Sequence, residues 1–178
     1  MDLLFSKDSV RDTTISSQDG RPIYHISTSE TLENERTTIT KFHHEMAVIQ
    51  LMNLYGVETC RVWGRDMAPK EGYGLTSVYQ IALCSKHTFT ASNGRRYTWK
   101  KGMLQDDYHR EVASFEKGHK GLLSGRPSSA RFSIAHEELP IVDDIVSTFV
   151  MVEQQLRLAK QIKTGSEIVD NVMTILGT

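Results

Sequence analysis

The residues of this chain that could bind a metal ion are its histidines and cysteines, and their spacing argues against a metal site. His43 and His44 are adjacent, so on a strand they point to opposite faces and cannot readily chelate one ion. Cys60 and Cys84 form no C-x-x-C pair, which argues against zinc and favours two buried thiols in a reducing compartment. No ligand spacing links the other histidines, which are His25, His87, His109, His119 and His136. The sequence therefore predicts no metal and no other cofactor.

A nucleophile paired with a base is equally hard to find. The G-x-S-x-G elbow is absent, and neither cysteine lies in a catalytic motif. The carboxylate pairs Asp106-Asp107 and Asp143-Asp144 are neighbours in sequence and do not face each other, and the second pair fits the start of a helix. We therefore predict no catalytic residue. Enzyme activity stays open, because active sites assemble from residues far apart in the chain.

Basic residues in loops and turns are the candidates for binding a phosphate group. Residues 118–127 form a glycine-rich stretch in which Lys120 and Arg126 could hold an anion together with backbone N–H groups. Arg95, Arg96, Lys100 and Lys101 flank a predicted hairpin and could contact an anionic head group. Both sets also fit a plainer interpretation, because solvated connections and charged hairpin rims are common.

Aromatic residues could supply the wall of a different site, a small-molecule pocket inside or at the mouth of the fold. Trp63, Tyr97 and Trp99 are the candidates, together with Tyr24. The alternative is that these rings simply belong to the core. The predicted ligand-binding residues are therefore Arg95, Arg96, Lys120, Arg126, Trp63, Tyr97 and Trp99.

Composition limits the partners that such residues could have. The chain has 178 residues, of which 39% are hydrophobic, enough for the core of one domain. Its 21 basic and 22 acidic residues give a net charge of -1, which argues against a nucleic-acid partner. No apolar stretch is long enough to span a bilayer, and the first residues are too few and too acidic for a signal peptide. We therefore expect a cytoplasmic protein with no transmembrane segment.

The elements that must position these residues are mostly strands. Runs rich in Thr, Ile, Val and Tyr alternate with turn signals, a pattern typical of an antiparallel sheet. We expect strands at residues 2–5, 11–16, 21–29, 36–42, 45–53, 60–63, 104–115 and 130–136. The clearest signal is 86–100, where Asn93-Gly94 separates two alternating runs and predicts a hairpin with a two-residue type I′ turn. Residues 75–84 fit either a strand or a helix.

A buried helix is predicted from Pro140 to about residue 158. Pro140, Asp143 and Asp144 fit a helix N-terminus. The apolar residues Ile141, Val142, Ile145, Val146, Phe149 and Val150 then cover most of the circumference, as in a helix buried all round. The sequence therefore predicts one α+β, mainly β domain over residues 1–160, in which a curled antiparallel sheet or β-barrel surrounds the helix. A helix lying across one sheet face is the alternative.

Residues 161–178 form a predicted C-terminal amphipathic extension. Thr164 and Glu167 have the spacing of a capping box and predict a short second helix that ends at Gly177. An apolar stripe follows the cap at Ile168, Val169, Val172, Met173, Ile175 and Leu176. We favour packing of this stripe on its own domain over a homodimer contact, because a monomer needs no additional partner.

The order of these motifs resembles a family of unassigned function found mainly in mushroom-forming (basidiomycete) fungi. The matching pieces include Asp12-Thr13-Thr14, residues 20–28, Arg61-Val62-Trp63-Gly64, residues 89–99 and residues 145–153. The family implies no activity and no catalytic residue. Its layout is similar to that of the tubby-like and scramblase-like barrels, whose association with phosphoinositides or membranes comes by fold-level analogy alone.

From these observations we predict a non-enzymatic binding or interaction module. Its ligand would be an anionic lipid or another phosphate-bearing molecule, and its partner a lipid head group or a protein. The alternative is a barrel that binds a small molecule and has an enzymatic activity.

Overall fold

The computed structural model describes residues 1–7, 9–31, 34–52, 56–67, 86–118 and 129–176, and it describes side chains except at 56–58 and 162–176. The strands are β1 (Asp2–Phe5), β2 (Thr13–Ser17), β3 (Pro22–Glu30), β4 (Asn34–Lys41), β5 (His44–Met52), β6 (Gly56–Val62), β7 (Arg65–Asp66), β8 (Lys86–Thr90), β9 (Arg96–Lys100), β10 (Met103–Asp106), β11 (Glu111–Glu116) and β12 (Arg131–Ile134). A 3₁₀ helix, η1 (His136–Ile141), leads into the long helix α2 (Val142–Leu176).

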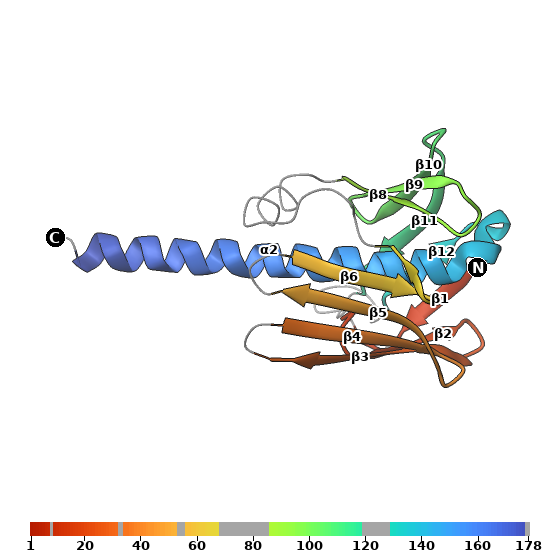
Figure 1. The fold of residues 1–178 in the computed structure, drawn as a ribbon, viewed down its shortest axis with the longest axis horizontal. Helices are drawn as coiled ribbons and strands as arrows, with labels where there is room; N and C mark the ends of the chain where they lie inside the picture. The colour runs from red at the N-terminus through yellow and green to blue at the C-terminus, as the bar shows by residue number, and fades with distance from the viewer. Residues whose placement is uncertain (8, 32–33, 53–55, 68–85, 119–128, 177–178) are drawn as a thin grey trace, which may run out of the picture.

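The described strands form a single 12-stranded antiparallel sheet in the order β7-β6-β5-β4-β3-β2-β1-β12-β11-β10-β9-β8. The sheet curls around the first half of α2, so that strands lie on opposite sides of the helix (Figure 1). This arrangement confirms the predicted α+β, mainly β fold with a curled sheet around a buried helix. The sheet is not closed into a barrel, because β7 and β8 stand at its two edges among the described strands. The alternative of a helix across one sheet face is wrong.

The core lies between the helix and the inner face of the sheet. Alternate residues point inwards on most strands, as Tyr24 and Ile26 do on β3, and burial of such apolar surface drives folding. Phe149 of α2 has its ring centroid 4.6 Å from that of Phe115 and 4.8 Å from that of Phe132. Other helix residues buried here are Ile141, Ile145, Val146 and Val150. The predicted burial of this helix all round is confirmed.

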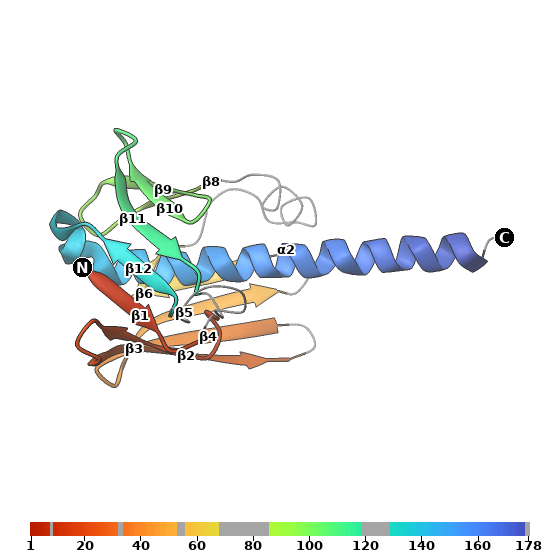
Figure 2. The same cartoon turned by 180° about the vertical axis from the view of Figure 1, so that it is seen from behind.

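The helix itself differs from the prediction at both ends. Pro140 lies within η1, so α2 begins two residues later, although Asp143 and Asp144 do occupy its first turn. No separate helix begins at Thr164, because α2 runs unbroken to Leu176. The preceding residues are good helix formers without proline, so nothing stops the helix there. Residues 164–176 project away from the sheet (Figure 2), which contradicts the expected packing of this segment on its own domain.

Two turns also differ from the sequence-based expectation. In the β8–β9 hairpin only Gly94 has a positive φ, and its N–H donates to Ala91 O, so the connection is a type I turn followed by a left-handed glycine rather than a type I′ turn. Residues 104–115 form two strands, because the Asp106 carboxylate accepts the backbone N–H groups of Tyr108 and Arg110 and fixes a turn. Cys84 and the uncertain stretch 75–84 lie outside the described residues.

Since the strands alternate in direction, every second connection lies at the same end of the sheet. At the helix-start end, where α2 begins, lie residue 1, the turns at 18–21, 42–43, 63–64, 91–95 and 107–110, and η1. At the helix-exit end, where α2 leaves the sheet, lie the connections at 6–12 and 101–102 and the adjoining ends of β3, β4 and β5. Figure 1 shows the two ends at the right and left of the sheet, respectively.

Candidate binding surface at the helix-start end

Asp143, in the first turn of α2, fastens one side of the sheet to the helix. One carboxylate oxygen accepts hydrogen bonds from Tyr24 Oη and Lys41 Nζ, each at 2.7 Å, and the other accepts one from Trp63 Nε1 at 2.9 Å. A carboxylate also suits the partial positive charge of a helix N-terminus. Burial, together with the neighbouring Asp143 carboxylate, raises the pKa of Tyr24 well above its ordinary value, so the phenol remains a hydrogen-bond donor.

Asp144 and Glu138 hold both edges of the sheet at this end, because β7 and the β8–β9 hairpin donate to them. Asp144 accepts hydrogen bonds from Arg65 Nη2 at 2.5 Å and from the backbone N–H of Ser92 at 2.6 Å, so it joins β7 to the β8–β9 turn. Glu138 accepts the Tyr97 hydroxyl at 2.7 Å, and burial raises the pKa of that phenol. These carboxylates already accept hydrogen bonds from strands and turns of the sheet, and their role here is to hold the β8–β9 turn and β7 in place.

The large hydrophobic side chains that are exposed in the described part of the chain all lie at the helix-start end. They are Met1 (42% exposed), Phe42 (60%), Trp63 (56%) and Tyr108 (80%). Phe42, Trp63 and Tyr108 each occupy a different turn. Monomeric proteins often expose single apolar residues, and what distinguishes these four is that they all lie at the same end of the sheet.

Backbone strain coincides with these exposed aromatic residues. Phe42, His43, Trp63 and His109 have φ values of 48°, 69°, 49° and 61°, a left-handed conformation that bulky residues rarely adopt. Such strain persists only where the surrounding structure enforces it, and it is concentrated at functional sites. For Trp63 the enforcing contacts are visible, because its backbone N–H donates to Met46 O and its indole to Asp143.

Three of the predicted ligand-binding residues come together at this end. Trp63, Arg95 and Arg96 are all exposed in or beside its turns, although 31 residues of sequence lie between Trp63 and Arg95. Tyr97 and Trp99 are instead buried, and the Trp99 indole donates to Thr148 Oγ1 at 3.0 Å within the core. Tyr24 is buried as well. Lys120 and Arg126 lie outside the described residues.

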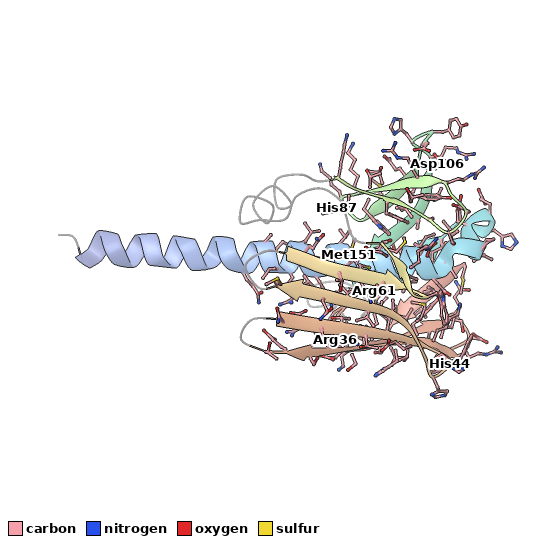
Figure 3. All side chains as sticks on the ribbon, viewed as in Figure 1. Arg36, His44, Arg61, His87, Asp106 and Met151 are labelled. Atoms are coloured by element: carbon pink, nitrogen blue, oxygen red, sulfur yellow. The ribbon has the colours of Figure 1, made fainter. Side chains whose placement is uncertain are left out.

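Sequence reasoning missed Phe42 and Tyr108. Phe42 was expected to end a strand and Tyr108 to lie within one, where alternation alone cannot tell an inward from an outward side chain. The available signal was polar context, because Phe42 precedes His43-His44 and Tyr108 follows Asp106-Asp107. Figure 3 shows His44 pointing outwards from the β4–β5 turn, and Asp106 on the opposite side of the sheet, at the base of the β10–β11 turn.

The helix-exit end has a different chemistry. Glu35 of β4 is buried and accepts a hydrogen bond from Arg157 Nη2 of α2, and Arg11 Nε lies 3.6 Å from its other oxygen. Arg11 also pairs with the exposed Glu30 at 2.6 Å. Next to this ion cluster, Gln154 Nε2 donates to Thr37 Oγ1 at 2.6 Å. The cluster holds the helix where it leaves the sheet.

Comparison with known proteins places the chain in a family. Residues 8–158 match a family of unknown function, DUF6593. This chain belongs to that family. The match covers β2 to β12 and the enclosed part of α2, and it stops before the projecting part. Searches of curated proteins and of solved structures found no match.

The described residues contain no helix long and apolar enough to cross a membrane. Within the same residues, no group of histidine, cysteine, aspartate and glutamate side chains could hold a metal ion. Cys60 is buried, and burial raises the pKa of its thiol to about 12, which makes it a poor nucleophile.

Proposed function

We propose that this DUF6593 protein is a non-enzymatic binding module whose helix-start end seats on a lipid surface containing anionic head groups. The observation that carries the proposal is that the large hydrophobic side chains exposed in the described residues, Met1, Phe42, Trp63 and Tyr108, all lie in the turns or chain start at that one end. Aromatic side chains with a polar edge are favoured where water meets lipid, because the ring leaves water while the polar edge stays hydrated.

Arg95 and Arg96 supply the contact to phosphate. Both are exposed in or beside the β8–β9 turn, whose backbone is held by the Ser92 N–H bond to Asp144. A guanidinium group can donate two parallel hydrogen bonds to a phosphate, so each of these exposed arginines suits a lipid head group. A free phosphate compound offers the same chemistry without the lipid surface.

The carboxylates of this end support binding over catalysis. Asp143, Asp144 and Glu138 accept hydrogen bonds from structural donors of the sheet, so they serve as fastenings. Fungal origin and a tubby-like layout, both implied by the sequence resemblance, belong to this proposal as well. The curled sheet around an apolar helix is compatible with that layout, and layout by itself carries no function.

The test is co-sedimentation with vesicles of phosphatidylcholine and phosphatidylserine at pH 6.5. We expect the double charge reversal Arg95→Glu with Arg96→Glu to reduce the bound fraction, and Phe42→Ser with Tyr108→Ser to reduce it further. Lys86→Glu with Lys101→Glu is the matched control, since it makes the same charge change at the helix-exit end of β8 and beyond β9. No retention of the natural protein, or equal losses in the control, would overturn the proposal.

Soluble inositol phosphates added to the same assay separate the two sources of phosphate. Competition that requires Arg95 and Arg96, together with no effect of the Phe42 and Tyr108 changes, would show a phosphate site without lipid seating. That result would contradict the lipid part of the proposal.

A further inference from the structure

We infer that seating of the helix-start end on an anionic lipid surface is controlled by pH through His43, His44, His109 and His136. This inference rests on the proposed function. It concerns how the same surface is regulated.

Three of these histidines follow exposed aromatic residues in the chain, and the fourth lies at the same end of the sheet. His43 and His44 directly follow Phe42 in the β4–β5 turn, and His109 directly follows Tyr108 in the β10–β11 turn. His136 begins η1 at the same end, and all of these imidazoles are exposed. Lipid that contacts the aromatic rings would therefore also meet the neighbouring imidazoles.

Without the histidines, acidic groups outnumber basic groups at this end. The basic groups are the Met1 ammonium, Arg21, Lys41, Arg61, Arg65, Arg95, Arg96, Arg110 and Arg36, whose guanidinium lies 4.0 Å from Glu45. The acidic groups are Asp2, Asp19, Glu45, Asp66, Asp106, Asp107, Glu111, Glu137, Glu138, Asp143 and Asp144. Electrostatic repulsion from an anionic surface is thus the default when every imidazole is neutral.

Ion pairs leave this acidic excess unchanged, because each pair removes one charge of either sign. Several of the cations already face a carboxylate of this end: Lys41–Asp143 at 2.7 Å, Arg65–Asp144 at 2.5 Å, Arg110–Asp106 at 2.6 Å and Arg21–Asp19 at 3.8 Å. Their charges are largely cancelled locally. Histidine is the side chain that changes charge between about pH 8 and pH 5. Its protonation therefore sets whether the surface repels or tolerates anionic lipid.

The expected effect is large enough to measure. A cation next to an anionic leaflet contributes about 1 kcal/mol, equivalent to roughly five-fold in partitioning. Even if only part of this is realised at each imidazole, the partition coefficient should rise by about ten-fold or more between pH 7.5 and pH 5.5. High salt should weaken the rise, because it screens exposed charges.

The experiment measures co-sedimentation with phosphatidylserine-containing vesicles at pH 7.5, 6.5 and 5.5. The quadruple variant His43→Gln, His44→Gln, His109→Gln, His136→Gln should lose most of the pH dependence. His25→Gln is the matched control, since His25 is exposed on the flank of β3 rather than in a turn of the helix-start end.

A second measurement excludes acid unfolding as the cause. Burial lowers the pKa of His87, so the unfolded chain takes up that proton more readily and stability declines as pH falls below about 6.5. Unfolded chains would adhere to pure phosphatidylcholine vesicles as well, whereas the inference requires a rise with anionic vesicles alone. Thermal melts at each pH give the folded fraction directly.

The possible failures are distinguishable. Equal binding at all pH values, an unchanged rise in the quadruple variant, or an equal rise with phosphatidylcholine would overturn the inference while leaving the proposed function standing. No binding to anionic vesicles at any pH would overturn both.

Discussion

The two ends of the sheet hold the same helix by opposite means. At the helix-start end the acids belong to the helix, and several strands and turns supply donors to the partly exposed Asp143 and to Asp144. At the helix-exit end the acid, Glu35, belongs to the sheet and is buried against Arg157 of the helix. At the helix-start end, several donors share these acids and hold strained turns whose side chains are exposed. At the helix-exit end, the buried ion cluster holds only the helix against the sheet. We therefore expect function at the first end and stability at the second.

The largest effect should come from the core that both ends share. Phe149→Asp places a carboxylate among the rings of Phe115, Phe132 and Trp99, where it has no partner, and we expect no folded protein. Circular dichroism and urea unfolding measure this. Phe149→Leu is the control and should retain a cooperative transition. A Phe149→Asp variant that melts at the natural temperature would show that the helix is peripheral.

Next in size should be the loss of the buried acid at the helix-exit end. Glu35→Ala leaves Arg157 and Arg11 facing each other without their shared counter-charge, which should reduce the free energy of unfolding by about 3–5 kcal/mol. Glu30→Ala removes an exposed partner of the same Arg11 and should cost at most about 1 kcal/mol. Similar losses in the two variants would contradict the assignment of stability to the buried cluster.

A smaller loss is expected at the helix-start end. Asp144→Ala removes the acceptor of the Ser92 N–H and the partner of Arg65, which is half-exposed and can return to water, so the cost should be about 2 kcal/mol. Asp19→Ala, at an exposed ion pair of the same end, serves as the control in urea unfolding. If Asp144→Ala proved as costly as Glu35→Ala, the contrast between the two ends would disappear.

The smallest effect on stability should come from truncation after Lys163. The removed part of α2 lies beyond the sheet, so the melting temperature should stay within about 2 °C of its original value. Light scattering coupled to size-exclusion chromatography reports any change of mass. A strongly lowered melting temperature with unchanged mass would show that these residues dock on the sheet after all.

The sequence-based prediction succeeded where side-chain alternation decides the structure. Tyr24 and Ile26 on one strand, and Tyr97 and Trp99 on another, have the spacing that buries alternate residues, and the apolar circumference of residues 141–150 requires an enclosed helix. The β8–β9 turn was wrongly predicted because Asn-Gly fits more than one hairpin type. In the observed turn, the backbone N–H of Ser92 donates to Asp144, which is distant in sequence. The local sequence of the hairpin cannot reveal this contact.

The candidate surface was harder to predict for a related reason. Trp63 and Arg95 were singled out for separate sites, a small-molecule wall and an anion contact, and only the strand order brings their turns to one end. Phe42 and Tyr108 were missed because their exposure depends on where each strand stops. Similarly, the spacing of Thr164 and Glu167 suits a helix start, but it does not interrupt a helix that is already running.

The length of α2 sets the distance between the helix-start end of the sheet and the C-terminal end of the helix. A helix of 35 residues extends about 52 Å, and its direction is fixed by Asp143 and Asp144 at one end of the sheet and by Arg157 at the other. If the helix-start end rests on a surface, the helix becomes a rigid spacer, directed away from that surface through the middle of the sheet. Whatever meets the residues near Leu176 would then be kept about 50 Å from the contact plane, well beyond the roughly 8 Å over which surface charge is felt at physiological salt.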